Sequence, residues 1–339
     1  MQKFLQRSSF FLIVFIALSV AIGNILPLKK YWGNEQYQLK IEGFRNGNYN
    51  TTFFGSSRIL TGVDPKYFDS LVSDIGVNIK SYNLATAGTW SNETFYLYEE
   101  FLEDSSLSSG IDIVFMEFQN IMAIQFDKIS TPKVIYYQSM KNTSFIADFA
   151  KEEVKKGSGK IPLSLSLVGL YSLAMIQEGL NVGKSKLFFP GIADSEHNKF
   201  DSYGYLKLER TTEKNINRAL DGYISSIQAN LTKKNLEPNL AFQNKLLALI
   251  KESHASGIKL VFVLPPVRLT PSMAAVFSSL PPENKIQLCD PLTFNQLYLS
   301  DNWADRTHFN SNGSRKFSEY FAQQFRRTHG PMSALDSIQ

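Results

Sequence analysis

Residues 50–62 read NTTFFGSSRILTG, in which a short apolar run, 51–54, leads into a Gly-Ser-Ser turn. The apolar run is typical of a buried strand. The Asp64-Pro65 pair that follows predicts a helix, because aspartate is a good N-cap and proline suits the first helical turn. A strand, a sharp turn and a helix in this order begin a βαβ unit. The turn therefore either connects two elements or presents a serine hydroxyl for chemistry.

The same alternation of strands and helices continues along the chain. Further strand-like runs lie at 79–84, 111–118, 257–267 and 285–290. A second helix is expected from about Ser91, where apolar residues recur at helical spacing. Strands separated by helices predict an α/β fold with a parallel sheet, helices on both faces, and active residues just after the carboxyl ends of the strands.

The N-terminal stretch predicts a membrane anchor. Lys3 and Arg7 precede an uncharged apolar stretch, residues 10–28, whose length is close to the ~20 residues of a membrane-spanning helix. We expect an uncleaved, single-pass signal-anchor, with the short tail in the cytoplasm and the rest of the protein outside it. A cleaved signal peptide and a buried core helix are the alternatives.

The chain is expected to divide into four parts. Residues 1–30 form the cytoplasmic tail and transmembrane anchor, and residues 31–49, rich in Lys, Asn, Gln and Gly, form a linker. Residues 50–330 form the folded domain, which residues 121–256 interrupt as a helical insertion without an assigned function. Residues 331–339 form a tail.

The composition narrows the function classes. Hydrophobic residues make up 43% of the 339 residues, which is enough for a packed core. The net charge of +4 comes from basic residues in the first thirty positions, so the remainder offers no electrostatic footprint for nucleic acid. The single cysteine, Cys289, lies in an apolar run and is expected to be a buried structural thiol. The sequence has no metal-binding spacing and no phosphate-binding loop, so we expect no metal and no cofactor.

A serine becomes a nucleophile only when a base takes its proton and a third group orients that base. The stretch DNWADRTHFN, residues 301–310, places Asp305 three residues before His308. A carboxylate at this spacing reaches one imidazole nitrogen and leaves the other free to act as a base. The other histidines, His197, His254 and His329, lie in the insertion, on a helix and in the tail. We therefore pair His308 and Asp305 with the Gly-Ser-Ser turn.

Gly55-Ser56-Ser57 and the later Asp-x-x-His sequence resemble two motifs of the SGNH/GDSL hydrolase family. The resemblance implies a flavodoxin-like, three-layer αβα sandwich with a parallel sheet. It makes Ser57 the nucleophile, His308 its base and Asp305 the partner of that base. Ser56 occupies the place where the family usually has aspartate, so the bracing of the turn departs from the family pattern.

The resemblance also implies an oxyanion hole. Its donors would be the backbone N–H groups of Ser57 and of Gly88, in the stretch YNLATAGTW, and the side-chain amide of Asn120. Glycine suits this position because a side chain would block the close approach of the backbone to a ligand. The third motif of the family is Gly-x-Asn-Asp, whereas residues 117–120 read EFQN. Asn120 therefore either donates to the oxyanion or serves as an ordinary loop or N-cap residue.

The N-terminal span combined with these motifs is similar to a membrane-anchored, extracytoplasmic branch of the family. Members of that branch act in alginate O-acetylation and in teichoic acid D-alanylation, beside a membrane-bound O-acyltransferase. The resemblance implies a periplasmic enzyme that transfers acyl groups, through an acyl-serine, to a cell-surface polysaccharide. A hydrolytic carbohydrate or lipid esterase and a non-catalytic polysaccharide-assembly subunit are the alternatives. Trp90 and Trp303 lie near the motifs and serve either to stack on sugar rings or to pack the core.

Overall fold

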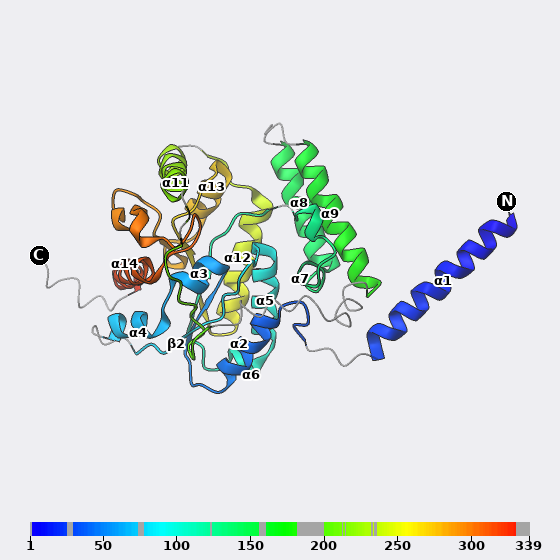
Figure 1. Ribbon diagram of the computed structural model, residues 1–339, viewed down its shortest axis with the longest axis horizontal. Helices are drawn as coiled ribbons and strands as arrows, with labels where there is room; N and C mark the ends of the chain where they lie inside the picture. The colour runs from blue at the N-terminus through cyan, green and yellow to red at the C-terminus, as the bar shows by residue number, and fades with distance from the viewer. Residues whose placement is uncertain are drawn as a thin grey trace, which may run out of the picture. The chain divides into compact units, whose positions relative to one another are not determined.

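The structure is a computed structural model, and its chain divides into two compact units (Figure 1). One unit comprises residues 1–38 and 122–195, and the other comprises residues 39–121 and 196–339. The structure describes residues 2–25, 30–73, 78–122, 124–155, 161–181, 200–211, 213, 215–231, 233 and 236–329. His197 and the predicted tail, residues 331–339, lie outside the described residues.

The second unit is built on a parallel five-stranded sheet with the order β2-β1-β3-β4-β5. Its strands are β1 (Thr51–Phe54), β2 (Ser81–Asn83), β3 (Ile113–Glu117), β4 (Lys259–Leu264) and β5 (Lys285–Gln287). The predicted α/β class and parallel sheet are confirmed. The order of the strands reverses between β1 and β3, and in open α/β sheets ligands bind outside the carboxyl ends of the strands at such a point.

Helices cover both faces of this sheet (Figure 1). Phe53 of β1 contacts Phe68 of α4 (Pro65–Ser73) and Phe321 of α14 (Ser311–His329) on one face. The next residue, Phe54, contacts Tyr98 of α5 (Ser91–Glu103) on the other face, as expected because successive side chains of a strand point to opposite faces. Among its described residues this unit also contains α3 (Ser57–Gly62), α6 (Ser105–Ser108), α11 (Ile216–Leu231), α12 (Leu240–Ala255), α13 (Pro271–Ser279), and the 3₁₀ helices η4 (Pro282–Asn284), η5 (Asn295–Tyr298) and η6 (Ser300–Asn302).

The prediction that residues 31–49 form a linker is wrong, because this segment contains a helix, α2 (Glu35–Arg45). Tyr37, Ile41 and Phe44 are buried, and their spacing of four and three residues places them on one face of the helix. The polar composition of the segment conceals this apolar face. The folded part of the chain therefore begins before residue 50.

Lys40, also on α2, is fully buried and donates hydrogen bonds from Nζ to three backbone carbonyls. The acceptors are Asn83 O at 2.8 Å, Ala85 O at 2.6 Å and Gly204 O at 2.6 Å. Burial lowers the pKa of Lys40 well below its usual value, and the negative charge of Asp201 opposes that shift. These bonds attach α2 to the carboxyl end of β2 and to the loop around residue 204.

The predicted insertion, residues 121–256, is too long. Only residues 122–195 belong to the other compact unit, whereas α11 and α12 belong to the unit that contains the sheet. α12 packs on β4 and buries Phe242, Leu246 and Leu249, so it is the crossover helix between β3 and β4. Parallel neighbours require such a crossover, and the sequence pattern did not separate it from the insertion before it.

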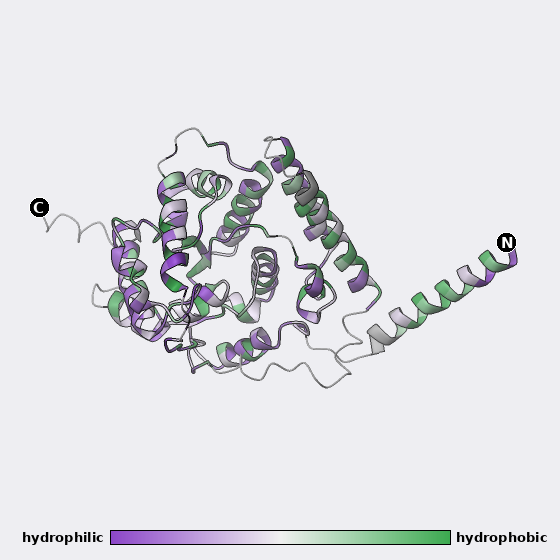
Figure 2. Ribbon diagram, turned by 45° about the horizontal axis from the view of Figure 1, so that its top comes forward, coloured by the Kyte–Doolittle hydropathy of each residue, from purple (hydrophilic) through white to green (hydrophobic). Residues whose placement is uncertain are grey.

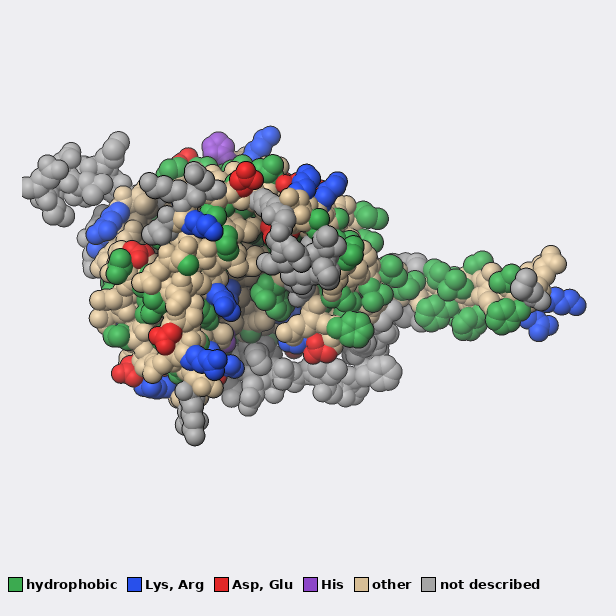
Figure 3. Space-filling model, turned by 90° about the horizontal axis from the view of Figure 1, so that it is seen from above, with side chains coloured by type: hydrophobic (Ala, Val, Ile, Leu, Met, Phe, Trp, Pro, Cys, Tyr) green, Lys and Arg blue, Asp and Glu red, His purple; other side chains and the backbone are tan. Residues whose placement is uncertain are grey.

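The other unit contains α1 (Gln2–Ile25), α7 (Pro132–Ile135), α8 (Met140–Lys155), α9 (Ile161–Gly179) and the 3₁₀ helix η1 (Phe126–Lys128). Hydrophobic residues lie along α1 (Figure 2), and their side chains cover much of its surface in Figure 3. In the described part of the chain, no helix has both the length and the apolar character needed to cross a membrane. The predicted span, residues 10–28, continues past Ile25 into residues outside that part, and the anchor stays a prediction.

Candidate active site

The Gly-Ser-Ser turn joins β1 to α3 and makes Ser57 the first residue of that helix. Ser56 is the N-cap, and its side-chain oxygen accepts a hydrogen bond from the backbone N–H of Arg58 at 3.3 Å. Ser57 thus lies at the carboxyl end of the strand next to the point where the strand order reverses. The backbone N–H of Ser57 has no acceptor within the helix, because the first N–H groups of any helix lack one.

Ser57, His308 and Asp305 form a continuous chain of hydrogen bonds. The Oγ of Ser57 is 2.8 Å from the Nε2 of His308, although the two residues are 251 positions apart in sequence. The Nδ1 of the same ring is 2.7 Å from the Oδ2 of Asp305. The structure therefore brings together the three residues that the sequence motifs single out for catalysis.

The partners of His308 define its tautomer. An ionised carboxylate has no proton to donate, so the Nδ1 of His308 carries the proton of the bond to Asp305. In a neutral ring the Nε2 is then the acceptor, and the hydroxyl of Ser57 donates to it. This arrangement is the one that a general base for a serine nucleophile requires.

The loop that carries Asp305 and His308 is closed at both ends by backbone pairing. Trp303 and Phe309 form an antiparallel bridge, and the N–H of Ala304 donates to the carbonyl of His308 at 2.9 Å. Trp303 is 1% exposed and its ring contacts that of Phe309, so it packs the core instead of forming a platform for sugars. The bridge holds the carboxylate and the imidazole on the same short loop, directly before α14.

Donors surround the Asp305 carboxylate. Its Oδ1 accepts hydrogen bonds from Thr307 N at 2.7 Å, Thr307 Oγ1 at 3.0 Å and His308 N at 3.0 Å. Partial burial acts to raise its pKa, but the hydrogen bond and charge of His308, together with the Thr307 donors, lower it to about 2. Asp305 is therefore ionised across the physiological pH range.

A second carboxylate, Glu117 at the end of β3, lies beneath the Gly-Ser-Ser turn, and its side chain is 0% exposed. Its Oε2 accepts from Ser56 N at 2.7 Å and from Gln119 Nε2 at 2.7 Å. Its Oε1 accepts from Arg58 Nε at 2.5 Å. Glu117 thus holds the residues on both sides of Ser57. Glu117 therefore supports the turn in this protein, in which position 56 is serine and not the aspartate usual in the family that the sequence resembles.

Gly55 allows this brace to form. A Cβ added to Gly55 would lie 2.7 Å from the Cβ of Glu117 and 2.8 Å from its Oε2, closer than side-chain atoms approach one another. Any larger residue at position 55 would push the carboxylate away from the turn. The glycine of the motif is therefore required by packing against β3.

The predicted oxyanion residues lie on loops at the same edge of the sheet. Gly88 has a φ of +64°, a left-handed conformation that favours glycine. The loop before it is bonded to the Gly-Ser-Ser turn, because Thr86 N donates to Gly55 O at 3.1 Å. The carbonyl of Asn120 accepts from the Ser91 hydroxyl at the start of α5. Gly88 and Asn120 thus lie on loops that follow β2 and β3, and donation to an oxyanion stays a prediction for both.

The other candidates from the sequence lie elsewhere. Cys289 is 1% exposed, and burial raises the pKa of its thiol to about 12. His254 is exposed on α12, next to the amino end of β4 and so at the opposite edge of the sheet from Ser57. Among the described residues, no group of three His, Cys, Asp or Glu side chains is arranged to hold a metal ion.

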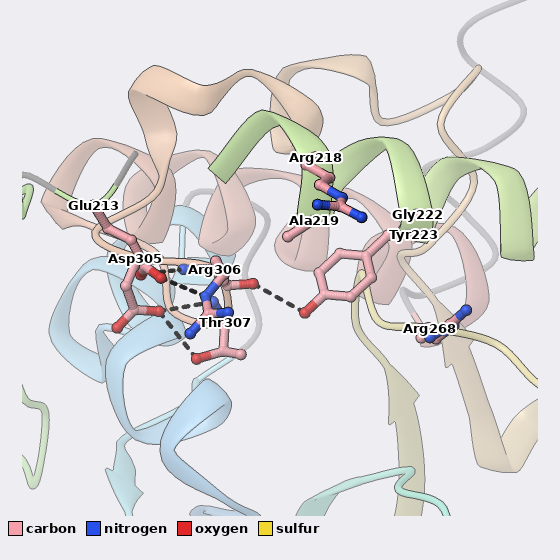
Figure 4. Close-up of a pocket in the computed structure, with 9 residues that line it drawn as sticks. All are labelled: Glu213, Arg218, Ala219, Gly222, Tyr223, Arg268, Asp305, Arg306 and Thr307. Carbon is pink, nitrogen blue, oxygen red and sulfur yellow. Dashed lines mark hydrogen bonds and ion pairs between the residues drawn. The ribbon is translucent and has the colours of Figure 1, made fainter. Parts of the chain in front are cut away.

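A cavity of about 650 Å³ opens beside the triad (Figure 4). Its walls come from α11, the loop after β4 and the loop that carries Asp305. Tyr223 of α11 lies in it and donates a hydrogen bond to the carbonyl of Arg306 at 3.0 Å. The size is that of a pocket for a small molecule or a short segment of a polymer.

No protein-family model matches the chain, and no curated protein matches it. The site is therefore interpreted from its own geometry. Sequence reasoning missed Glu117 as a brace and the residues of the cavity. A charged residue at the end of an apolar strand was the available signal for Glu117, because carboxylates are rarely buried without a partner.

Proposed function

We propose that the protein is an SGNH-type serine acyltransferase or esterase that acts on O-acyl groups of a cell-surface polysaccharide. The observation that carries the proposal is the bonded chain from Ser57 through His308 to Asp305, at the carboxyl edge of a parallel sheet. The same motifs and the parallel sheet support the finer proposal of a flavodoxin-like, three-layer SGNH sandwich.

The first half-reaction forms an acyl-serine. The Oγ of Ser57 attacks the acyl carbonyl while the Nε2 of His308 takes the hydroxyl proton, and Asp305 stabilises the resulting imidazolium. The tetrahedral oxyanion accepts hydrogen bonds from the N–H groups of Ser57 and Gly88, and from the amide of Asn120. The C–O bond to the leaving alcohol then breaks, and His308 returns the proton to that oxygen.

The second half-reaction releases the acyl group. A hydroxyl of the acceptor attacks the acyl-serine, His308 takes its proton, and the bond to Ser57 Oγ breaks as the serine recovers a proton. A sugar hydroxyl as acceptor gives a transferase, and water gives an esterase. The chemistry at Ser57 is the same in both cases, so the acceptor alone separates them.

We also propose that the protein works outside the cytoplasm, attached to the membrane by its N-terminal helix and beside a membrane-bound O-acyltransferase. The support is the apolar surface of α1, where Phe10 and Phe11 are 70% and 73% exposed. The non-catalytic alternative is less well supported, because a structural subunit has no need of an aligned serine, imidazole and carboxylate.

Trapping the acyl-serine tests this proposal. The full-length protein is mixed with p-nitrophenyl acetate, quenched and digested, and mass spectrometry locates the acetyl group. We expect acetylation of Ser57 in the wild type and none in Ser57→Ala. Ser56→Ala is the matched control, because Ser56 is the neighbouring hydroxyl that caps α3 and does not bond to His308.

Two outcomes would contradict the proposal. One is acetylation at the same level in Ser57→Ala, and the other is the complete absence of both acetylation and p-nitrophenol release in the wild type. Acetate release in the absence of a glycan favours an esterase, whereas release that requires an added polysaccharide favours a transferase. Full complementation of a deletion strain by Ser57→Ala would support the non-catalytic alternative.

A further inference from the structure

Some of the positively charged residues that line the cavity beside the triad have no carboxylate partner among the described residues. Arg218, Arg268 and Arg306 line it, together with two carboxylates, Glu213 and Asp305 (Figure 4). Arg306 forms an ion pair with Glu213, and Asp305 is bonded to the imidazole of His308. Arg218 and Arg268 are exposed, and neither forms an ion pair or hydrogen bond with the described residues. Two guanidinium groups are therefore available to a ligand.

We propose that this cavity binds a negatively charged group of the substrate, a carboxylate or a phosphate, through Arg218 and Arg268. The inference rests on the proposed function, because it assigns the substrate of the same site. Guanidinium is planar and presents paired N–H donors that match the two oxygens of a carboxylate or phosphate. Arg218 approaches from α11 and Arg268 from the loop after β4, so the two donors come from different elements.

The cavity shares residues with the hydrogen-bond network of the triad. Asp305 and Thr307 line it and also belong to the hydrogen-bond network that holds His308. A substrate anchored there by its charge would therefore lie against the loop that carries His308. Holding the reacting groups in a fixed geometry is a large source of rate enhancement.

Tyr223, which also lines the cavity, lies within electrostatic reach of several arginines. Its pKa is raised, chiefly by burial, while the charges of Arg58, Arg306 and Arg268 oppose the rise and that of Asp305 adds to it. The three guanidinium groups are therefore within electrostatic reach of the phenol. Arg58 and Arg306 are already paired with carboxylates, which leaves Arg268 as the member of this set that lacks one.

Gly222 lines the cavity beside open space. Gly222 lies on α11 between Arg218 and Tyr223, and a Cβ added at this glycine would have nothing within 4 Å. A bulky residue at position 222 would thus enter open space inside the cavity. We therefore expect Gly222→Leu to obstruct the ligand without disturbing the packing of α11.

Binding measurements on full-length Ser57→Ala test the proposal without turnover. The probes are trigalacturonate for a carboxylate, a short glycerol-phosphate oligomer for a phosphate, and maltotriose as the neutral ligand. We expect at least one anionic probe to bind more tightly than maltotriose, with an affinity that falls as salt is added. The comparison of the two anionic probes identifies the carboxylate or the phosphate.

In the same background, Arg218→Gln with Arg268→Gln should weaken binding of the preferred anion by at least about tenfold, because two charge-assisted hydrogen bonds are lost. Arg327→Gln, at an exposed arginine of α14, is the matched control and should bind like its parent. Thermal unfolding of each variant shows that the fold is retained.

Equal binding of anionic and neutral probes would overturn the inference, as would an anion affinity that the double variant leaves unchanged. Neither result depends on whether Ser57 is a nucleophile, since the serine is absent from every protein measured. Loss of acyl-serine formation in the preceding experiment would contradict the proposed function instead. The two failures are therefore distinguishable.

Discussion

Two carboxylates support the surroundings of Ser57, one through His308 and the other through the Gly-Ser-Ser turn, and they differ in exposure. Asp305 lies on a loop at the rim of the site, and its side chain is 28% exposed. Glu117 lies beneath the turn at the end of β3, and its side chain is 0% exposed. Asp305 is bonded to His308, the group that would move a proton, whereas Glu117 is bonded to the backbone and side chains around Ser57.

The difference in exposure indicates that the two carboxylates have different roles. The rim carboxylate must act on an imidazole that a substrate can reach, so it remains partly exposed and contributes little to the core. The buried carboxylate contacts no substrate, and its removal would leave donors without an acceptor in a dry interior. We therefore expect changes at the rim to reduce the rate more than the stability, and changes at Glu117 to reduce the stability first.

The largest effect is expected at the centre of the chain of bonds. Ser57→Ala and His308→Ala should each lower kcat for ester cleavage by about 10⁴- to 10⁶-fold, because each removes a group that the reaction cannot replace. Their free energies of unfolding should change by about 1 kcal/mol or less, since both side chains lie at the rim. A steady-state assay combined with urea unfolding measures both quantities. Retained activity in a folded variant would refute the assignment.

Asp305→Asn is expected to lower kcat by about 10³- to 10⁴-fold while the protein stays folded. An amide can donate to the Nδ1 of His308, which would favour the tautomer with its proton on Nε2 and remove the acceptor for Ser57. Asp301→Asn is the control, because Asp301 pairs with Arg210 on the surface and its side chain is 82% exposed. If both variants lose activity equally, Asp305 has no special role.

Glu117→Gln should lower the stability more than it lowers the activity. We expect a loss of about 2–4 kcal/mol in the free energy of unfolding, because an amide cannot accept all the hydrogen bonds made by Ser56, Arg58 and Gln119. Glu99→Gln is the control, since Glu99 pairs with Lys245 at a more exposed position and should lose less than about 1 kcal/mol. Urea unfolding decides the matter, and a Glu117 variant as stable as the wild type would break the comparison.

The smallest expected effect is the change of the free energy of unfolding with pH. Its sign is opposite at two aspartates. The pKa of Asp305 is lowered to about 2, so the stability gained from its ionised form is present above about pH 4 and disappears as pH falls towards 2. The pKa of Asp69 is raised, chiefly by burial, to about 6, so stability falls as pH rises from about 4 to 6. The two shifts correspond to about 2–3 kcal/mol, which partial exposure to solvent reduces to about 1–2 kcal/mol.

Urea unfolding from pH 2 to 7 measures these differences. The stability of Asp305→Asn relative to the wild type should approach zero at the acid end. That of Asp69→Asn should become more favourable as pH rises from about 4 to 6. The same sign at both positions would show that the two carboxylates do not differ in the way their surroundings require.

The sheet could be predicted from the sequence because its strands are short apolar runs bounded by turn residues. β1 is found at the predicted residues, and β4 lies within the predicted run 257–267. The position of α2 could not be predicted in the same way, because its buried face is dispersed among polar residues. The contacts of Lys40 with Asn83 and Gly204 are tertiary and leave no local pattern.

The residues of the site also differ in whether a local sequence pattern or only a tertiary contact reveals them. Ser57, Asp305 and His308 were predicted because their chemistry requires particular residue types at particular spacings. Glu117 was missed because its contact with the Gly-Ser-Ser turn joins residues 61 positions apart and follows no motif. The cavity was missed because Arg218 and Arg268 come to line one cavity only after α11 has folded beside the sheet.

The buried ammonium of Lys40 has a consequence for shortening the chain. A soluble version that starts at residue 50 would remove the helix that supplies this donor, and three carbonyls in the interior would lose their partner. Each orphaned acceptor is expected to cost about 1–3 kcal/mol, enough to leave a small domain close to unfolding. The productive boundary for recombinant truncation therefore lies ahead of Glu35.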